Sequence, residues 1–267
     1  MADRPTRLSL PGDCPWLDGI HHYTSTDSTN TQAKHLAKAG APHGTVLIAD
    51  SQTGGRGRMG RTFVSPAGQG IYLSVILRPS CPPDRLMHLT CAVAVAMCDA
   101  VESVAGFRPG AKWINDLVCG GRKLGGILTE LSLDTATGLT EYAVVGIGIN
   151  CNQQLSHFPA ELQDMAGSLQ MVTGQPVDRA ALAAAMITAL WQMDKQLLTD
   201  KPGLMARYRT DCITLGQDVA VHGADTLWHG KAIDMDADGA LLIRRPDGSL
   251  CTVGSGEVSV RGLYGYI

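Results

Sequence analysis

Three arginines and four glycines stand within eight residues of this chain, the segment GGRGRMGR at 54–61. Glycines let backbone N–H groups approach an anion closely, and arginines neutralise its charge, so the segment suits a phosphate or a carboxylate. The letters also fit G-x-G-x-x-G, but a dinucleotide fingerprint must run from a strand into a helix. A proline-containing loop and a strand follow here, which argues strongly against the Rossmann interpretation. A solvated arginine-rich loop remains the alternative.

A second polar cluster is the segment KWIND at 112–116, which is followed seven residues after Asp116 by Lys123. Strands over 111–118 and 124–133, joined by a hairpin at 119–122 (CGGR), would let Lys112 and Lys123 converge on one site. A strand interior rarely holds Lys, Asn and Asp together without a reason. A charged edge strand is the structural alternative.

Two further motifs are weaker on their own. In VGIGIN at 145–150, glycines alternate with apolar residues, which marks close approach of a ligand or equally of another backbone. The segment DSTN at 27–30 is by default a helix cap. The histidines are dispersed and the eight cysteines lack zinc-ligand spacing, so we expect no metal held by protein side chains.

The elements that would position these motifs are predicted from periodicity and from turn residues. Helices are expected over 29–39, 84–104 and 178–198, and strands over 45–49, 71–77, 111–118, 124–133 and 141–150. From Gly216 onwards short apolar runs alternate with turn signals, which predicts a compact β-module of four or five strands. The domain prediction is an N-terminal arm at 1–19, a main domain at 20–214 and a small domain at 215–267.

Composition excludes several classes of protein. The chain has 267 residues, 45% hydrophobic, with a net charge of -3, which gives no general attraction to nucleic acid. The longest apolar run, residues 91–97, is far shorter than the ~20 residues that span a bilayer. The short arm leaves no room for a helix-turn-helix domain. Scattered cysteines without disulfide spacing predict a reducing cytoplasm.

Taken in order, the four motifs resemble those of biotin protein ligases: DSTN, QTGGRGRMGR, KWxND with RKLxGILxE, and GIGINCN. The resemblance covers residues 20–267, because GALLIRRPDG and GEVSVRG resemble the family's small C-terminal domain. It implies an α+β fold: a mixed-sheet catalytic domain of the biotin/lipoate protein ligase type with a small C-terminal SH3-like β-barrel. The short arm points to the monofunctional form, without a DNA-binding domain.

The resemblance also implies the reaction. Biotin would be activated by ATP to biotinyl-5'-AMP and transferred to a specific lysine of a biotin carboxyl carrier protein, with Mg²⁺ held largely by the ATP phosphates. Cations suit this chemistry because a carboxylate must be brought against a phosphate. We expect no DNA or membrane partner, a cytoplasmic location, and a monomer or homodimer. The acceptor's identity, the affinity for biotin and any regulatory role lie beyond the sequence.

Site residues are carried over by motif. The catalytic set would be Arg58, Lys112, Lys123 and Asp116, with Asp116 as an orienter or base for the incoming lysine. The biotin-binding set would be Ser28, Thr29, Asn30, Gln52, Arg56, Gly57, Arg58 and Lys123. The nucleotide-binding set would be Arg58, Arg61, Lys112, Asn115, Gly148, Asn150 and Tyr208. One departure from the family pattern is Ile114, where many members have proline.

Three other functions compete with this interpretation. A lipoate or octanoate ligase or transferase shares the expected fold but acts on a different acid. A non-catalytic biotin sensor would use the same pocket without turnover. The β-module could instead bind nucleic acid or a peptide, although its acidic residues outnumber its basic ones, which disfavours nucleic acid.

Overall fold

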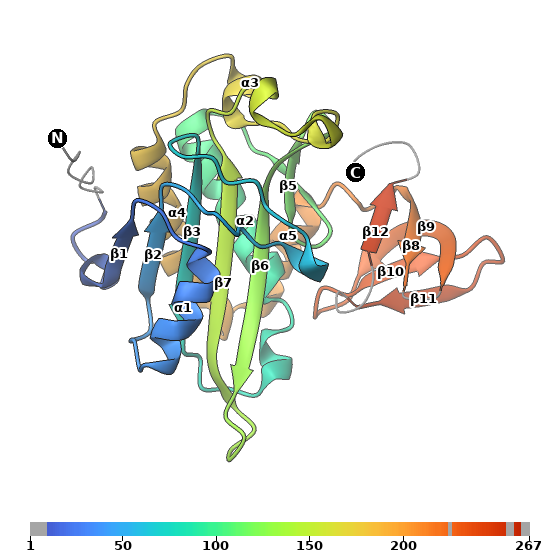
Figure 1. The fold of residues 1–267 in the computed structure, drawn as a ribbon. Coiled ribbons are helices and arrows are strands. Elements are labelled where there is room, and N and C mark those ends of the chain that lie inside the picture. Colours follow the sequence, from blue (N-terminus) through green and yellow to red (C-terminus); the bar gives the residue numbers. More distant parts are fainter. Residues whose placement is uncertain (1–9, 224–225, 255–258, 263–267) are drawn as a thin grey trace.

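Seven strands form the main sheet of the protein, which is represented by a computed structural model describing residues 10–223, 226–254 and 259–262. Their order across the sheet is β1-β2-β3-β7-β6-β5-β4 (Figure 1). β1 pairs with β2 in parallel, and the other neighbours pair antiparallel, so the predicted mixed sheet is confirmed. The strands are β1 Ile20–Tyr23, β2 Thr45–Ala49, β3 Gly70–Leu77, β4 Gly110–Lys112, β5 Asp116–Cys119, β6 Arg122–Leu133 and β7 Thr140–Asn150.

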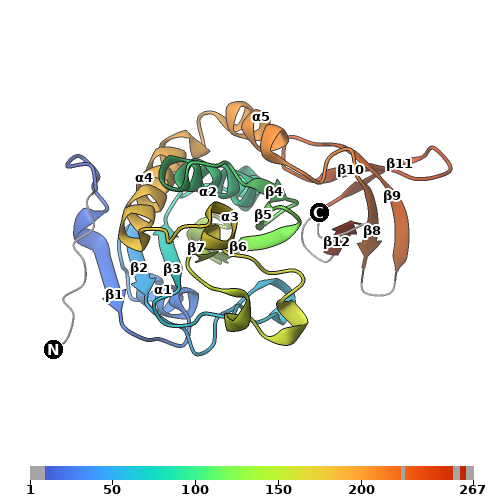
Figure 2. The ribbon, with the colours of Figure 1, turned by 90° about the horizontal axis from the view of Figure 1, so that it is seen from above.

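Helices cover both faces of this sheet (Figure 2). The long helices α2 (Leu89–Ala105) and α4 (Arg179–Leu197) pack together on one face, where α5 (Lys201–Asp211) contacts both of them. The helix α1 (Thr29–Lys38) packs on β2, β3 and β7 from the opposite face. The remaining helical segments are short: α3 Leu169–Thr173, η1 Leu17–Gly19, η2 Arg58–Gly60, η3 Pro83–Leu86, η4 Leu155–His157 and η5 Ala160–Leu162.

The strand β7 shows how the sequence pattern divides the two faces. Successive side chains of a strand point to opposite sides. Val145, Ile147 and Ile149 therefore enter the main core beneath α2 and α4. Gly146 and Gly148 lie on the opposite side, where a helix and a loop approach the sheet closely. The alternation of glycine and apolar residues thus separates a packed core from a face with room for a ligand.

A second sheet lies beside β4, the edge strand of the main sheet, and its neighbour β5, and forms the C-terminal module (Figures 1 and 2). It is antiparallel, in the order β11-β10-β9-β8-β12, which confirms the predicted small β-module. The connection between α5 and β8 contains the predicted boundary near residue 215. The strands are β8 Asp218–His222, β9 Leu227–Met235, β10 Leu241–Arg244, β11 Leu250–Val253 and β12 Ser259–Gly262.

Polar contacts fasten this module to the main domain. Trp113 donates its indole N–H to the carbonyl of Gly239 at 2.8 Å. Arg209 of α5 donates to the carbonyl of Met235 at 2.6 Å, and Lys201 pairs with Asp238. The module is therefore attached both to α5 and to the segment that follows β4.

Three predicted elements need correction. The helix expected over 84–104 begins as the 3-10 turn η3, and α2 starts only at Leu89. The strand expected over 111–118 is two short strands separated by a turn. Residues 1–9 of the predicted arm lie outside the described residues. The rest of the arm is not loose, because Cys14 and Trp16 are buried in the core.

The helical segment Pro83–Ala105 has the length and the apolar composition of a membrane-spanning helix. It was not among the candidates predicted from the sequence. However, 67% of its apolar window is buried inside the fold, between the sheet and α4. This is the pattern of a core helix in a globular domain, whose apolar residues face other helices and strands.

Candidate active site

A cavity of about 910 Å³ opens on the face of the sheet that carries α1. Its wall includes the start of α1, the strands β6 and β7, the turn at 112–116, the segment 158–166 and the 54–61 segment, called here the glycine-arginine loop. Every predicted site residue except Tyr208 lines this cavity. These residues are Ser28, Thr29, Asn30, Gln52, Arg56, Gly57, Arg58, Arg61, Lys112, Asn115, Asp116, Lys123, Gly148 and Asn150.

One end of the cavity is a buried polar network at the start of α1. The Thr29 backbone N–H donates to Gln52 Oε1 at 2.8 Å, and Gln52 Nε2 donates to the Ser65 hydroxyl at 2.9 Å. Ser74 on β3 donates to Asn30 Oδ1 at 2.6 Å. Ser28, Thr29, Asn30 and Ser74 are all buried. Because buried polar groups are costly unless they are paired, these hydrogen bonds hold the side chains in fixed orientations.

The glycines of β7 make this network possible. A Cβ at Gly146 would lie 1.9 Å from Asn30 Oδ1, and one at Gly148 would lie 2.4 Å from the ring of Phe63. Both distances are far below van der Waals contact. The sheet therefore has glycine where Asn30 and Phe63 pack directly against the backbone.

Glu130 on β6 gathers polar groups from two elements at the rim of this network. Its carboxylate accepts from Lys34 Nζ at 2.8 Å and from Asn30 Nδ2 at 3.0 Å, both on α1. It also accepts from Arg56 Nη1 of the glycine-arginine loop at 3.1 Å. Burial alone would raise the pKa of Glu130, but these hydrogen bonds and nearby positive charges outweigh it and lower the pKa.

The other end of the cavity holds a chain of charged and amide groups. Arg58 donates to Asn115 Oδ1 at 3.0 Å, and Asn115 Nδ2 donates to Asp116 Oδ1 at 3.1 Å. The same Asp116 oxygen pairs with Lys123 Nζ at 2.6 Å. Burial lowers the pKa of Arg58, and the charge of Asp116 partly offsets this. The guanidinium remains cationic at neutral pH, since arginine retains its proton in proteins.

The glycine-arginine loop is folded as a tight turn. Gly57 N–H donates to the Arg61 carbonyl at 2.7 Å, and Phe63 N–H donates to the Gly55 carbonyl at 2.9 Å. Met59 at its tip has a φ of 55°, and 59% of the residue is exposed. Arg56 and Arg61 are exposed on this turn and Arg58 is half-buried, beside a cavity whose floor is buried.

The segment KWIND lies on a turn and not within a strand. β4 ends at Lys112 and β5 begins at Asp116, and the peptide between Trp113 and Ile114 is cis. Lys112 and Lys123 nevertheless both line the cavity, as the expected hairpin required. Gly120 and Gly121, with φ of 57° and 72°, form its turn.

Tyr208, which was expected near the nucleotide, does not line this cavity. Tyr208 on α5 is fully buried beside Cys91 and Cys212 and is not part of the cavity wall. Burial raises the pKa of its hydroxyl group. Because α5 packs against α2 and β4, this ring faces the core on the far side of the sheet.

Several residues in the cavity wall or directly beside it were not found from the sequence. Phe63 packs over Gly148, Glu130 joins α1 to the loop, and Asp164 lies opposite in the segment 158–166. The letter E of RKLxGILxE at Glu130 was a usable signal. Phe63 and Asp164 carried none, since both stand in irregular segments.

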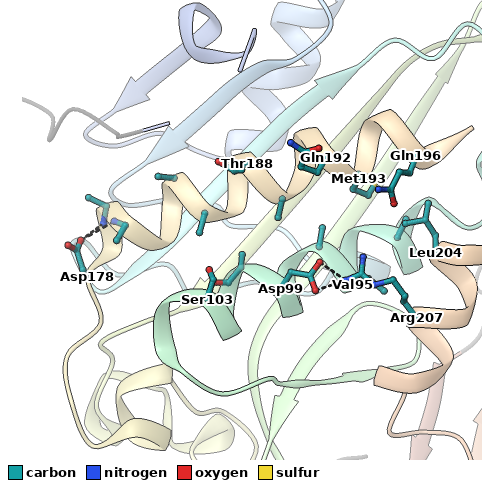
Figure 3. A pocket seen from close by; sticks show the side chains of 18 residues that line it. Val95, Asp99, Ser103, Asp178, Thr188, Gln192, Met193, Gln196, Leu204 and Arg207 are labelled. Carbon is teal, nitrogen blue, oxygen red and sulfur yellow. Dashed lines mark hydrogen bonds and ion pairs between the residues drawn. The ribbon is translucent and has the colours of Figure 1, made fainter. Parts of the chain in front are cut away.

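A second cavity, of about 780 Å³, lies between α2, α4 and α5 on the other face of the sheet (Figure 3). Its lining is rich in alanine from both long helices. Asp99 and Arg207 form an ion pair at 2.6 Å beside it (Figure 3). No predicted site residue lines this groove.

Metal-ligating side chains do not cluster in the part of the chain that the structure describes: no three His, Cys, Asp or Glu residues there could jointly hold an ion. The acidic residues of the cavity wall are Asp116 and Asp164. Such a site would suit a metal carried in by a phosphate ligand better than one held by the protein alone.

Comparison with known proteins gives matches along most of the chain. Residues 23–150 match the Biotin/lipoate A/B protein ligase family, and residues 214–261 match the Biotin protein ligase C terminal domain. The chain is 34% identical to a biotin--[acetyl-CoA-carboxylase] ligase of Mycobacterium tuberculosis, over 97% of this chain and 95% of that protein. It is 35% identical to the bifunctional ligase/repressor BirA of Bacillus subtilis, over 93% of this chain and 76% of that protein.

A solved structure agrees with these matches. The biotin protein ligase from Aquifex aeolicus in complex with biotin and ATP superimposes with a TM-score of 0.77 and 29% identity, covering 91% of this chain and 99% of that one. Together with the ordered motifs that line one cavity, these likenesses show that the chain belongs to the biotin protein ligase family.

Proposed function

We propose that this protein activates biotin with ATP to give biotinyl-5'-AMP and then transfers biotin to a lysine of a carboxylase carrier protein. The observation that carries the proposal is the single cavity that joins a fixed polar network at one end to Arg58, Lys112 and Lys123 at the other. A neutral, hydrogen-bonding ring system would occupy the first end, and the carboxylate attached to it would point to the cations.

The first step forms a bond between a biotin carboxylate oxygen and the α-phosphorus of ATP, and the α–β phosphoanhydride bond breaks to release pyrophosphate. Two anions must meet, so the main need is to offset their repulsion and to align them. Lys123 would neutralise the carboxylate, and Lys112 would neutralise the phosphate. The ion pair of Asp116 with Lys123 at 2.6 Å fixes the position of that ammonium group.

In the second step the lysine amine of the carrier attacks the acyl carbon of the mixed anhydride. An amide bond forms, the acyl–phosphate bond breaks, AMP leaves and the amine loses a proton. A lysine amine is mostly protonated at neutral pH, so a base would help. Asp116 can take this role only if its contacts with Lys123 and Asn115 are rearranged, and positioning of Lys123 is the better-supported role for it.

Mg²⁺, when bound with ATP, would supply charge neutralisation on the phosphates. Asp116 and Asp164 are the carboxylates of the cavity wall that could approach such an ion. We further propose action in the cytoplasm without DNA, as a monomer or homodimer. All eight cysteines are unpaired, which fits a reducing compartment, and the net charge of -3 does not favour DNA.

The test is exchange of labelled pyrophosphate into ATP with Mg²⁺, using biotin, lipoate and octanoate as separate acids. We expect exchange with biotin alone. Exchange with lipoate or octanoate in place of biotin would overturn the substrate and keep the mechanism. No exchange with any acid, from protein with a cooperative unfolding transition, would favour a sensor.

A further inference from the structure

The carboxylate of Glu130 joins two parts of the site. It contacts Asn30 and Lys34 at the start of α1, and it forms an ion pair with Arg56 of the glycine-arginine loop. Its side chain is 23% exposed, so solvent screens its contacts only in part. It lies on β6, a central strand held by β7 along most of its length. The carboxylate is thus a rigidly mounted negative charge at the rim of the cavity.

The carboxylate of Glu130 accepts hydrogen bonds from Asn30 on one side and from Arg56 on the other. Asn30 Nδ2 donates to Glu130 Oε2 at 3.0 Å, and Asn30 Oδ1 accepts from Ser74 at 2.6 Å. The amide of Asn30 is therefore fixed in one orientation, with its oxygen toward β3 and its nitrogen toward β6. Arg56 meets the same carboxylate from outside, with Nη1 within 3.2 Å of both oxygens.

The Arg56 contact joins two parts of very different exposure. The Arg56 side chain is 43% exposed and belongs to the loop that reaches over the cavity. Because Glu130 is already oriented by Lys34 and Asn30, formation of the Arg56 pair requires ordering of only the arginine side. An ion pair with one preorganised partner loses less side-chain entropy than a pair between two mobile side chains.

We propose that Glu130 is a positioning residue that holds the glycine-arginine loop over the bound acid through Arg56, while it orients Asn30 below. This inference rests on the proposed function, since it assigns a role in retaining biotin and its adenylate. Lys123 pairs with Asp116 at the other end of the cavity, so the loop anchor governs retention and the chemical step remains with the lysines.

The test is a double-substitution cycle with Glu130→Gln and Arg56→Gln, followed by biotin-dependent pyrophosphate exchange and by release of preformed adenylate. The glutamine in Glu130→Gln keeps the side-chain volume and an acceptor for Asn30 but loses the charge that pairs with Arg56. We expect Glu130→Gln to raise KM for biotin and the adenylate release rate about fivefold, with kcat for exchange nearly unchanged. In the Arg56→Gln background the same change should add less than about a twofold effect.

Two controls separate the loop from the rest of the structure. Lys34→Gln removes one of the two groups that orient Glu130 and leaves Arg56 intact, so the retention defect should be clearly smaller than that of Glu130→Gln. Glu141→Gln removes an exposed carboxylate on the neighbouring strand β7 and should match the unaltered protein. Independent effects of Glu130→Gln and Arg56→Gln, or a Lys34→Gln protein with the same defect, would overturn the proposal.

Two further experiments test the proposal even if the Glu130→Gln protein does not fold. Glu130→Asp keeps the charge on a shorter side chain and should give an intermediate release rate. In the ligand-free unaltered protein, tryptic cleavage within 56–61 should accelerate as salt rises, because a half-exposed pair is screened. Arg58 and Arg61 should be cleaved fast at all salt concentrations in Arg56→Gln. Salt-independent cleavage in the unaltered protein would contradict the anchor, whereas absence of biotin exchange in that protein would instead refute the proposed function.

Discussion

The cavity has two sides that are built in opposite ways. The side made by α1, β3, β6 and β7, called here the inner wall, is buried and fully hydrogen-bonded around Asn30 and Ser74. The glycine-arginine loop that faces it is an exposed turn. Arg56 joins this loop to Glu130 of the inner wall, and Arg58 joins it to Asn115 on the turn after β4.

The difference separates recognition from retention. A wall that is rigid before the ligand arrives loses little entropy on binding, so it can select the acid. A loop with few contacts can open and close at small cost, so it can admit substrate and shield a reactive mixed anhydride. Substitutions in the wall should therefore affect folding or chemistry, and substitutions in the loop should affect how long the adenylate stays.

The largest effect should come from the cation at the end of the inner wall. Lys123→Gln removes the ammonium group that pairs with Asp116, and we expect kcat for pyrophosphate exchange to fall about 10²–10³-fold, as for other lost electrostatic stabilisers. Lys38→Gln at the exposed end of α1 is the matched control. If Lys123→Gln exchanges pyrophosphate at a rate close to that of the unaltered protein, the biotin carboxylate does not bind at Lys123.

A change in the middle of the wall should damage both stability and binding. Gly146→Ala introduces a Cβ 1.9 Å from Asn30 Oδ1, so either β7 or α1 must move. We expect a loss of about 1–3 kcal/mol in the free energy of unfolding, by denaturant titration, and KM for biotin raised at least about tenfold. Gly12→Ala, where nothing lies within 4 Å, is the control. A stable variant with unchanged KM would show that the wall is not rigid.

A change in the loop should leave stability unaltered. Arg58→Gly removes the contact with Asn115, and we expect adenylate synthesis to continue while adenylate release accelerates about tenfold. Mass spectrometry of added bystander proteins should then reveal labelled lysines beyond the carrier. If the variant makes adenylate and labels the carrier alone, the loop does not retain the intermediate.

The smallest expected effect is the pH dependence of stability that Glu130 causes, where the inner wall meets the glycine-arginine loop. The pKa of Glu130 is lowered in the folded protein, so its contribution to stability is present above its ordinary value of 4.5 and is lost as pH falls through the folded value. The unaltered protein should lose more unfolding free energy than Glu130→Gln between about pH 6 and about pH 3, by less than the Gly146→Ala effect. If the free energy of unfolding depends on pH in the same way in both proteins, Glu130 does not contribute this pH dependence.

The sequence predicted much of the main domain because the signals for its strands and turns are local. The alternation of glycine and apolar residues in β7, the run Thr45–Ala49 and the glycine pair at 120–121 each reflect strand or turn geometry within a few residues. The ordered motifs then placed Lys123, Asn30 and Arg58 in one site.

The failures arise where distant packing decides the structure. A strand over 111–118 is locally reasonable, but Trp113 hydrogen-bonds to Gly239 in the other domain, and the chain turns there. Tyr208 has an aromatic ring suited to a base, but the face of α5 that it occupies is set by packing against α2 and β4. Neither contact leaves a trace within a short window of sequence.

The Trp113–Gly239 hydrogen bond joins residues 126 positions apart in the chain. At translation rates of about 5–20 residues per second, Gly239 is synthesised roughly 6 to 25 s after Trp113. The turn that carries Lys112 and Asn115 therefore emerges from the ribosome well before its support exists. Once β7 has been made, the nascent main domain has all the strands of its sheet and its glycine-arginine loop but lacks the hydrogen bond that braces this turn, so the cavity is completed late in synthesis.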